Sequence, residues 1–194
     1  YLYLVVVPVC SLILAVFLAH ALIGPFGRMI GDGVAFAVRH LMTGSFAPIG
    51  AALFGFLYAP LVITGVHQTT LAIDLQMIQS MGGTPVWPLI ALSNIAQGSA
   101  VIGVTEPAMY GINLKYRFPM LCAMIGSGLA GLLCGLNGVM ANGIGVGGLP
   151  GILSIQPSYW QVFALAMAIA IIIPIVLTSF IYQRKYRLGT LDIV

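Results

Sequence analysis

The stretch from Phe118 to Gln183 contains no charged residue and no histidine, and this feature restricts the fold more than any other. In the whole chain only 6% of residues are charged, whereas 60% are hydrophobic. A soluble domain has about 25% charged residues. A chain of this composition could not cover a surface that faces water, so we expect it to lie in a lipid bilayer. Its 194 residues allow about six crossings or re-entrant pieces at roughly 20 residues per span.

The apolar runs predict an all-α membrane protein built as a multi-span helical bundle. Breaks at prolines, glycines and charges divide the chain into predicted spans at residues 2–24, 46–66, 86–104, 119–136 and 160–182. Residues 28–45 mix apolar and polar side chains, which predicts an amphipathic helix at the membrane interface. Residues 137–154 are rich in glycine, which favours a re-entrant or interfacial segment over a lipid-facing helix.

Basic residues flank the apolar runs and therefore indicate topology. Cytoplasmic loops of membrane proteins carry an excess of Lys and Arg. The final cluster around Lys185 predicts a cytoplasmic C-terminus, and Arg28, Arg39, Lys115 and Arg117 agree with that orientation. The net charge of +3 is dispersed, with no basic face interleaved with aromatic residues, so we expect no binding to nucleic acid.

Glu106 is the only acidic residue between Asp74 and Asp192. A buried carboxylate costs several kcal/mol unless partners satisfy it, so intramembrane acids usually have a function. Pro107 disfavours α geometry at Glu106, which predicts a break in the helix at the charge. Open backbone at membrane depth is tolerated only beside protein or a watery cavity. Together these features predict a binding site for a polar solute.

A second polar group begins at His67, directly after an apolar run. Gln68, Thr69 and Thr70 follow, and side chains of these types can donate to and accept from sugar hydroxyls. The simpler alternative is an interfacial histidine that bonds to backbone. Asp74 has two interpretations, a second acid of the site or a solvated loop residue. The other histidines, His20 and His40, are expected at helix ends or in the interfacial helix.

Several other chemistries lack support in the sequence. The cysteines Cys10, Cys122 and Cys134 lie in apolar segments and match no zinc or redox spacing, so we expect small buried hydrophobic residues. The run from Gly143 to Gly148 matches Gly-x-Gly-x-x-Gly, but no predicted strand precedes it and no acid follows about 20 residues on. We predict no metal, no cofactor and no catalytic residue within this chain.

Two motifs resemble a known family. Thr64-Gly65-Val66-His67-Gln68 and Gly103-Val104-Thr105-Glu106-Pro107 are similar to motifs of the membrane-spanning enzyme IIC component of the sugar phosphotransferase system, glucose superfamily. Asn94-Ile95-Ala96-Gln97-Gly98 and the glycine-rich stretch 137–151 add to the resemblance. The resemblance covers essentially the whole chain. Within the family, the chain is most similar to trehalose-specific permeases, with sucrose and β-glucoside permeases next.

The resemblance implies a homodimeric transporter in the bacterial inner membrane, with a sugar site between two re-entrant hairpins. It implies uptake of a disaccharide, with trehalose as the expected sugar. Uptake would be coupled to phosphorylation of the sugar by a phosphocysteine on a IIB domain. This makes the chain the membrane component of a phosphotransferase enzyme, without the phosphoryl-carrying domain. The substrate-binding residues that it implies are His67, Gln68, Thr69, Thr105 and Glu106.

The sequence also departs from the family pattern. It contains no IIB domain and lacks the earlier spans, so we expect a later part of the transport domain. Gly98-Ser99-Ala100-Val101 runs almost directly into the Glu106 motif, where relatives are expected to have a span exit, a charged loop and a return. These departures leave two alternatives open: a channel or carrier that does not phosphorylate sugar, and a structural membrane fragment without activity.

Overall fold

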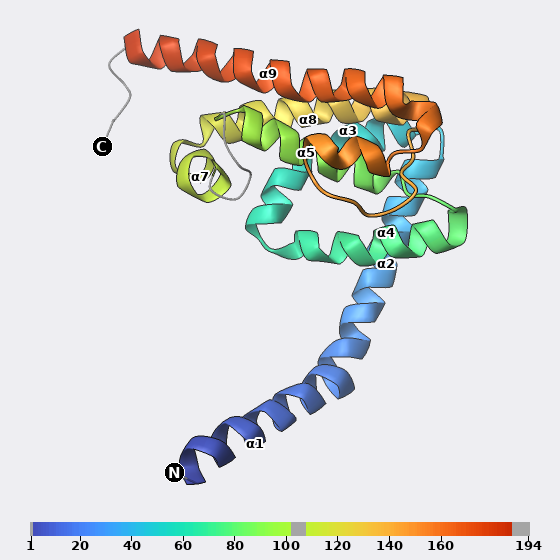
Figure 1. Ribbon diagram of the computed structural model, residues 1–194, viewed down its shortest axis with the longest axis vertical. Coiled ribbons are helices and arrows are strands. Elements are labelled where there is room, and N and C mark those ends of the chain that lie inside the picture. Colours follow the sequence, from blue (N-terminus) through green and yellow to red (C-terminus); the bar gives the residue numbers. More distant parts are fainter. Residues whose placement is uncertain (1, 102–107, 188–194) are drawn as a thin grey trace. The chain divides into compact units, whose positions relative to one another are not determined.

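The structure is a computed structural model that describes residues 2–101 and 108–187 (Figure 1). Contacts divide the chain into two compact units, Tyr1–Val38 and Arg39–Val194. All the regular elements of the described residues are helices, and β-type pairing is confined to the isolated bridges Thr84–Ala141 and Ala141–Ile155. The prediction of an all-α chain is therefore confirmed.

The first unit is a run of helix. α1 covers Leu2–Leu18, a π-helical turn covers Ala19–Ile23, and α2 covers Gly24–Thr43, with its last residues in the second unit. The sequence suggested that Pro25 closes the first apolar run, but the helix continues through it. Proline is tolerated in the first turn of a helix, and Pro25 follows the π-helical turn at such a position. The apolar side chains of α1 that the structure describes, from Val6 onward, are exposed, as lipid-facing residues would be.

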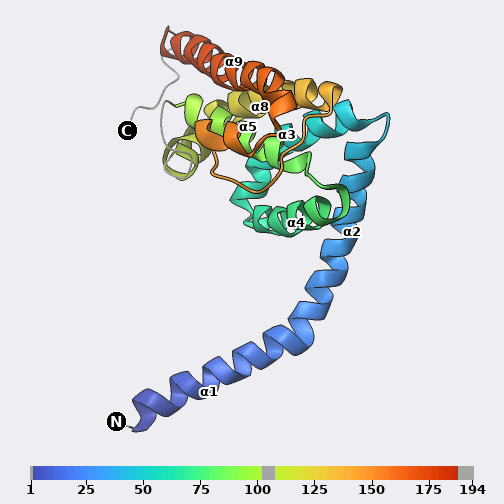
Figure 2. The ribbon, with the colours of Figure 1, turned by 45° about the vertical axis from the view of Figure 1, so that its right-hand side comes forward.

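The second unit is a bundle around α8, which covers Phe118–Asn137. α8 contacts α3 (Ala47–Ile63), α5 (Val86–Ser99) and α9 (Trp160–Arg187), and α9 runs alongside α8 in both views (Figures 1 and 2). Small residues allow these close approaches, as is common between membrane helices. A Cβ atom added to Gly131 would lie 2.6 Å from the backbone oxygen of Ala51.

One face of α9 is buried and the opposite face is apolar and exposed. The buried side chains are Phe163, Ala166, Ala170 and Pro174, which recur at intervals of three or four residues. The exposed face carries Leu165, Ile172, Val176 and Phe180. A long helix that is apolar on its exposed face is suited to lipid rather than to water. Pro174 itself packs against Gly126 of α8, whose added Cβ would lie 2.5 Å from the proline Cγ.

Three described helices are long and apolar enough to cross a membrane: Val6–Phe26, Phe118–Asn137 and Pro157–Lys185. α3 is apolar but shorter, at 17 residues. α5 ends at Ser99, before the end of the predicted span 86–104, whose last three residues lie outside the described part of the chain. The prediction of apolar membrane-spanning helices is thus confirmed for part of the chain.

The polar stretch after α3 forms a short helix, α4, at Thr69–Met81. A 3-10 turn at Val66–Gln68 precedes it. Gly65 before the turn and Gly82 after the helix have φ angles of 76° and 73°, a left-handed conformation that glycine adopts without steric cost. Gly82 thus ends α4.

The glycine-rich segment after α8 has no long helix. Gly138, with φ of 62°, ends α8, and short 3-10 helices follow at Leu149–Ser154 and Pro157–Tyr159. The Ala141 backbone pairs with Thr84 through hydrogen bonds of 2.9 and 2.8 Å, which attaches this segment to the start of α5. The indole of Trp160 donates to the Ile155 carbonyl at 2.9 Å, where α9 begins.

Candidate functional site

The site is centred on His67, in the turn between α3 and α4. Gly65 allows the chain to reverse there, and the Gly65 carbonyl accepts a 3.4 Å hydrogen bond from the Gln68 amide. The His67 side chain is half-buried, while Gln68 and Thr69 are exposed. The structure therefore brings together three of the five predicted site residues.

Two neighbours define the surroundings of the imidazole. Gln68 Nε2 lies 3.1 Å from His67 Nε2 on the exposed side, where the amide can donate to the ring nitrogen. The Tyr58 ring of α3 meets the imidazole edge-on, with centroids 6.4 Å apart and planes at 80°. The enclosed His67 Nδ1 has no hydrogen-bond partner within the described structure. A neutral imidazole that accepts at Nε2 carries its proton on Nδ1, so this group has an unused donor.

Thr70 fixes the backbone of the same turn. Its hydroxyl donates to the His67 carbonyl at 2.6 Å and also interacts with the Tyr58 side chain. Thr70 is buried, and it lies on the face of α4 that also carries Ile73, Asp74 and Met77. The position of His67 thus depends on the buried face of α4 as well as on its own turn.

Asp74 is a fully buried carboxylate, with no exposed surface. Its Oδ1 accepts a 2.5 Å hydrogen bond from the Thr84 hydroxyl, the Trp87 backbone amide also favours its charged form, and Oδ2 has no hydrogen-bond partner within the described structure. The Thr84 oxygen in turn accepts from the Val86 amide at 3.1 Å. These amides are the unpaired donors at the start of α5, where a negative charge is favourable. Thr84 therefore caps α5, and Asp74 holds the Thr84 hydroxyl from another helix.

Burial raises the pKa of Asp74 to about 6, because the apolar surroundings disfavour the charged form. The bonds from Thr84 and from the Trp87 amide act in the opposite direction. The carboxyl remains mostly ionised at neutral pH. Of the two sequence interpretations, the solvated loop residue is wrong, because Asp74 lies inside a helix and is enclosed.

α5 is buried on nearly all sides, and two of its buried side chains are polar. Ser93 and Gln97 are fully buried, and Gln97 Nε2 donates to Ser93 Oγ at 3.0 Å. Asn113, after the break in the described chain, is also buried and donates to the Gln97 carbonyl at a weak 3.4 Å. Gln97 Oε1 and Asn113 Oδ1 have no partners within the described structure. These two polar groups are enclosed within the bundle rather than presented to lipid.

Thr105 and Glu106 lie outside the described residues, so the other half of the predicted site has no described geometry. α5 ends at Ser99, and the description resumes with a π-helical turn at Ala108–Asn113. The bond between Gln97 and Asn113 brings together the two flanks of the segment that contains Glu106.

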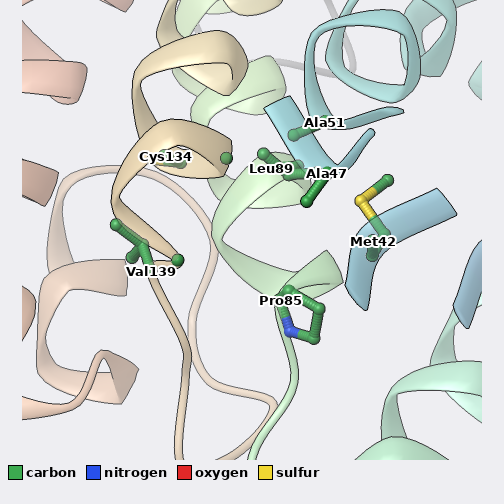
Figure 3. Close-up of a pocket in the computed structure, with 9 residues that line it drawn as sticks. Met42, Ala47, Ala51, Pro85, Leu89, Cys134 and Val139 are labelled. Atoms are coloured by element: carbon green, nitrogen blue, oxygen red, sulfur yellow. The ribbon is translucent and has the colours of Figure 1, made fainter. Parts of the chain in front are cut away.

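A small cavity between the α3, α5 and α8 ends is apolar and does not suit a sugar (Figure 3). Leu89, Cys134 and Val139 lie around it, and its volume is about 20 Å³. One water needs roughly 10–15 Å³, whereas ligand pockets are about 300–1,000 Å³. No group of three or more metal-ligating side chains occurs in residues 2–101 and 108–187.

Comparison with the sequences of known proteins places this chain in a family. The chain is 89% identical to the trehalose-specific EIIBC component of the PTS system of Escherichia coli K12, over 100% of the chain and 46% of that protein. It is 45% identical to the trehalose-specific EIIBC component of Bacillus subtilis 168, over 95% of the chain and 44% of that protein. This chain belongs to the enzyme IIC family of the sugar phosphotransferase system. The resemblance inferred from the two motifs is confirmed.

A sucrose-specific EIIBC component of Pasteurella multocida is 37% identical, over 92% of the chain and 43% of that protein. The chain thus spans less than half the length of these curated relatives. The match to the Escherichia coli protein extends over 218 positions, which leaves 24 positions unmatched by the 194 residues of this chain. No protein-family model matches the chain. No solved structure gives a significant match.

The structure adds three candidate site residues that the sequence analysis did not name: Tyr58, Thr84 and Asn113. Thr84 had a local signal, because a threonine before Pro85 and an apolar helical run is typical of a helix start. Tyr58 and Asn113 lie in apolar stretches and had no such signal. Their roles depend on contacts with His67 and Gln97.

The cysteines of this enzyme IIC chain differ in exposure. Cys122 and Cys134 are buried, as predicted, whereas the Cys10 side chain is exposed. The prediction of a buried residue is therefore wrong for Cys10, which lies on α1 among apolar side chains that are exposed as well. His20 is exposed too, in the π-helical turn Ala19–Ile23, with its Nδ1 3.2 Å from the Val16 carbonyl.

Proposed function

We propose that this chain is the sugar-binding and translocating part of a phosphoenolpyruvate-dependent phosphotransferase permease for trehalose. The observation that carries the proposal is the 89% identity to a trehalose-specific EIIBC component over the whole chain. The identity is 45% to a second trehalose-specific relative and 37% to a sucrose-specific one, which favours trehalose over sucrose.

In this proposal His67 and Glu106 hold the sugar hydroxyls, with Gln68, Thr69 and Thr105 beside them. The described half of the site supports it. The His67 ring nitrogen Nε2 lies on the exposed side beside the Gln68 amide, and the exposed Thr69 follows them in the chain. Sugar hydroxyls require both donors and acceptors. An ionised Glu106 would supply the strongest acceptor, because hydrogen bonds to a charged group are about twice as strong as neutral ones.

The proposal extends to the arrangement in the membrane. α4 and α5 form the helical pair after His67, and we assign it as one re-entrant hairpin, with the glycine-rich segment at its base. We place the C-terminus in the cytoplasm because Arg184, Lys185 and Arg187 lie in the last turn of α9. The functional unit is a homodimer in the bacterial inner membrane, surrounded by lipid.

We further infer where the 24 unmatched positions of the Escherichia coli relative fall: directly before the position that corresponds to Glu106 of this chain. The match to the Escherichia coli relative is longer than this chain, and the abrupt passage from Val101 to the Glu106 motif is where a second hairpin would need its first arm. Transport by this chain would then require that segment to be restored.

Phosphorylation in this proposal is performed by a separate IIB domain that carries a phosphocysteine. A reactive cysteine needs a partly exposed, electropositive setting, whereas Cys122 and Cys134 are buried among apolar side chains. The test combines membranes that contain the restored protein with phosphoenolpyruvate, the general phosphotransfer proteins and labelled trehalose, with and without a IIB domain. We expect labelled sugar phosphate only when IIB is present.

Two results would contradict the proposal. Sugar phosphate formed without IIB would place the phosphoryl carrier in this chain. Trehalose phosphate absent under all conditions, while labelled sucrose is phosphorylated, would reject the trehalose assignment. A control without phosphoenolpyruvate separates phosphorylation from simple accumulation, which a channel or carrier would give.

A further inference from the structure

The helix α4 lies between two glycines that act as natural pivots. Gly65 and Gly82 both have left-handed φ angles, and α4 occupies the 13 residues Thr69–Met81 between them. Large changes of backbone angle at such positions have little steric cost. The orientation of α4 therefore has to be set by the contacts of its own side chains.

The buried face of α4 provides those contacts. Thr70, Ile73, Asp74 and Met77 are its buried residues, and Asp74 is the one with a charge. Apolar contacts allow small rotations and slides, whereas a hydrogen bond between buried groups has a narrow geometry. The 2.5 Å bond from Thr84 to Asp74 therefore determines the register of α4 against the start of α5.

A short series of contacts leads from Asp74 to His67. Thr70 is four residues before Asp74, one turn away on the same helix face. The Thr70 hydroxyl donates to the His67 carbonyl, and it also interacts with Tyr58. Tyr58 touches the imidazole edge and lies in the field of the Asp74 charge. A rotation of α4 would move Thr70 and, with it, the His67 backbone.

We propose that Asp74 is a positioning residue: by binding Thr84 at the start of α5, it holds α4 so that His67 is presented to the sugar. The proposal rests on the proposed sugar-binding role of His67. Asp74 is enclosed and acts through Thr70, so it touches no substrate itself.

Thr84 also ties in the glycine-rich segment. Its amide and carbonyl pair with Ala141, so its side chain is held at a fixed point while it binds Asp74. Thr84 is fully buried and the Ala141 side chain is too. The point to which α4 is attached is thus itself rigid, as a positioning contact requires.

The experiment uses the complete permease in detergent and measures trehalose affinity by calorimetry. Thr84→Val keeps the shape of the side chain and removes the donor, and Thr84→Ser restores it. We expect Thr84→Val to bind trehalose about tenfold more weakly, a change that corresponds to one hydrogen bond of roughly 1.4 kcal/mol. We expect Thr84→Ser to bind trehalose with near-normal affinity. Ser80→Ala, on the exposed side of α4, is the matched control and should have no effect.

A double-mutant cycle separates positioning from general loss of structure. Thr84→Val is combined with His67→Asn, which weakens the proposed sugar contact but keeps a polar side chain. If Thr84 acts through His67, the valine change has little further effect in the asparagine background. Melting temperatures of all variants are measured alongside.

Three outcomes would overturn the inference. If Thr84→Val lowers the melting temperature but leaves the trehalose affinity unchanged, the contact between Asp74 and Thr84 only stabilises the fold. Additive effects of the two substitutions would mean that Thr84 acts on the sugar by another route. If His67→Asn alone leaves affinity unchanged, the His67 assignment itself fails, and the inference falls with it.

Discussion

The Ser127 hydroxyl on α8 donates a 2.7 Å hydrogen bond to the Gly55 carbonyl on α3, 72 residues earlier in the chain. The helix backbones are close enough there that a Cβ atom added to Gly55 would lie 2.6 Å from the backbone carbonyl oxygen of Ser127. This contact is possible only because small residues face each other. It forms the centre of the bundle from which α5 and the His67 turn are positioned.

The first prediction concerns this close packing. We expect Gly131→Ala to destabilise the protein by about 1–3 kcal/mol, the usual cost of overpacking, because its new methyl would meet the rigid backbone oxygen of Ala51 at 2.6 Å. Thermal unfolding in detergent measures the effect. Gly143→Ala is the control, because no atom lies within 4 Å of its added methyl. Equal melting temperatures for the two variants would contradict the packing geometry.

The second prediction concerns His67. We expect His67→Ala to impair trehalose uptake strongly while membrane insertion is retained, because a lost imidazole leaves sugar hydroxyls unpaired in a closed site. Uptake of labelled sugar by cells with matched expression measures it. His20→Ala, at an exposed histidine whose ring contacts the Val16 carbonyl, should leave uptake unchanged. Normal uptake by the His67 variant would favour the interfacial-histidine alternative.

The third prediction concerns Glu106. We expect Glu106→Gln to weaken trehalose binding about 10- to 100-fold, because hydrogen bonds to a charged group are worth about 1.5–3 kcal/mol and the amide keeps the shape without the charge. Isothermal calorimetry on the complete permease measures the affinity. The melting temperature should stay near that of the unsubstituted protein. Unchanged affinity would remove Glu106 from the site.

The fourth prediction concerns pH and Asp74. Its pKa is raised from 3.8 to about 6 on folding, so the folded protein holds this proton over a range where the unfolded chain has lost it. The contribution to stability is therefore complete below about pH 4 and is lost as the pH rises through 6, by about 3 kcal/mol. Asp74→Asn should abolish this component.

The measurement for Asp74 is the melting temperature of both proteins between pH 4 and pH 7. Because other titrating groups are shared, the difference between the two curves isolates Asp74. We expect the unsubstituted protein to lose stability relative to Asp74→Asn as the pH rises. Parallel curves would show that the carboxyl titrates alike in the folded and unfolded states.

Much of the secondary structure could be predicted from local sequence signals. The charge-free run after Phe118 contains the two clearest spanning helices of the second unit. The π-helical turn and the continued helix at Pro25 were not predicted, because a proline is compatible with both the end and the first turn of a helix. The choice between them depends on the backbone of the preceding turn.

The candidate site was only partly predictable. A histidine followed by hydroxyl and amide residues at the end of an apolar run identified the His67 turn. The position of Asp74 could not be decided, because a carboxylate in a polar stretch suits both a solvated loop and an enclosed site. Its partner, Thr84, is ten residues away and on another element. The folded position of α5 decides which donors reach the carboxylate.

The sequence by itself determined that this chain is a helical membrane protein related to enzyme IIC, because hydropathy, breaks and short motifs are local properties of the chain. Only the tertiary structure decided that Asp74 holds the Thr84 hydroxyl, that Tyr58 meets His67, and that Ser127 bonds to Gly55. These pairs are joined by packing across elements. Their energies depend on burial and on distances between atoms, which the order of residues alone does not specify.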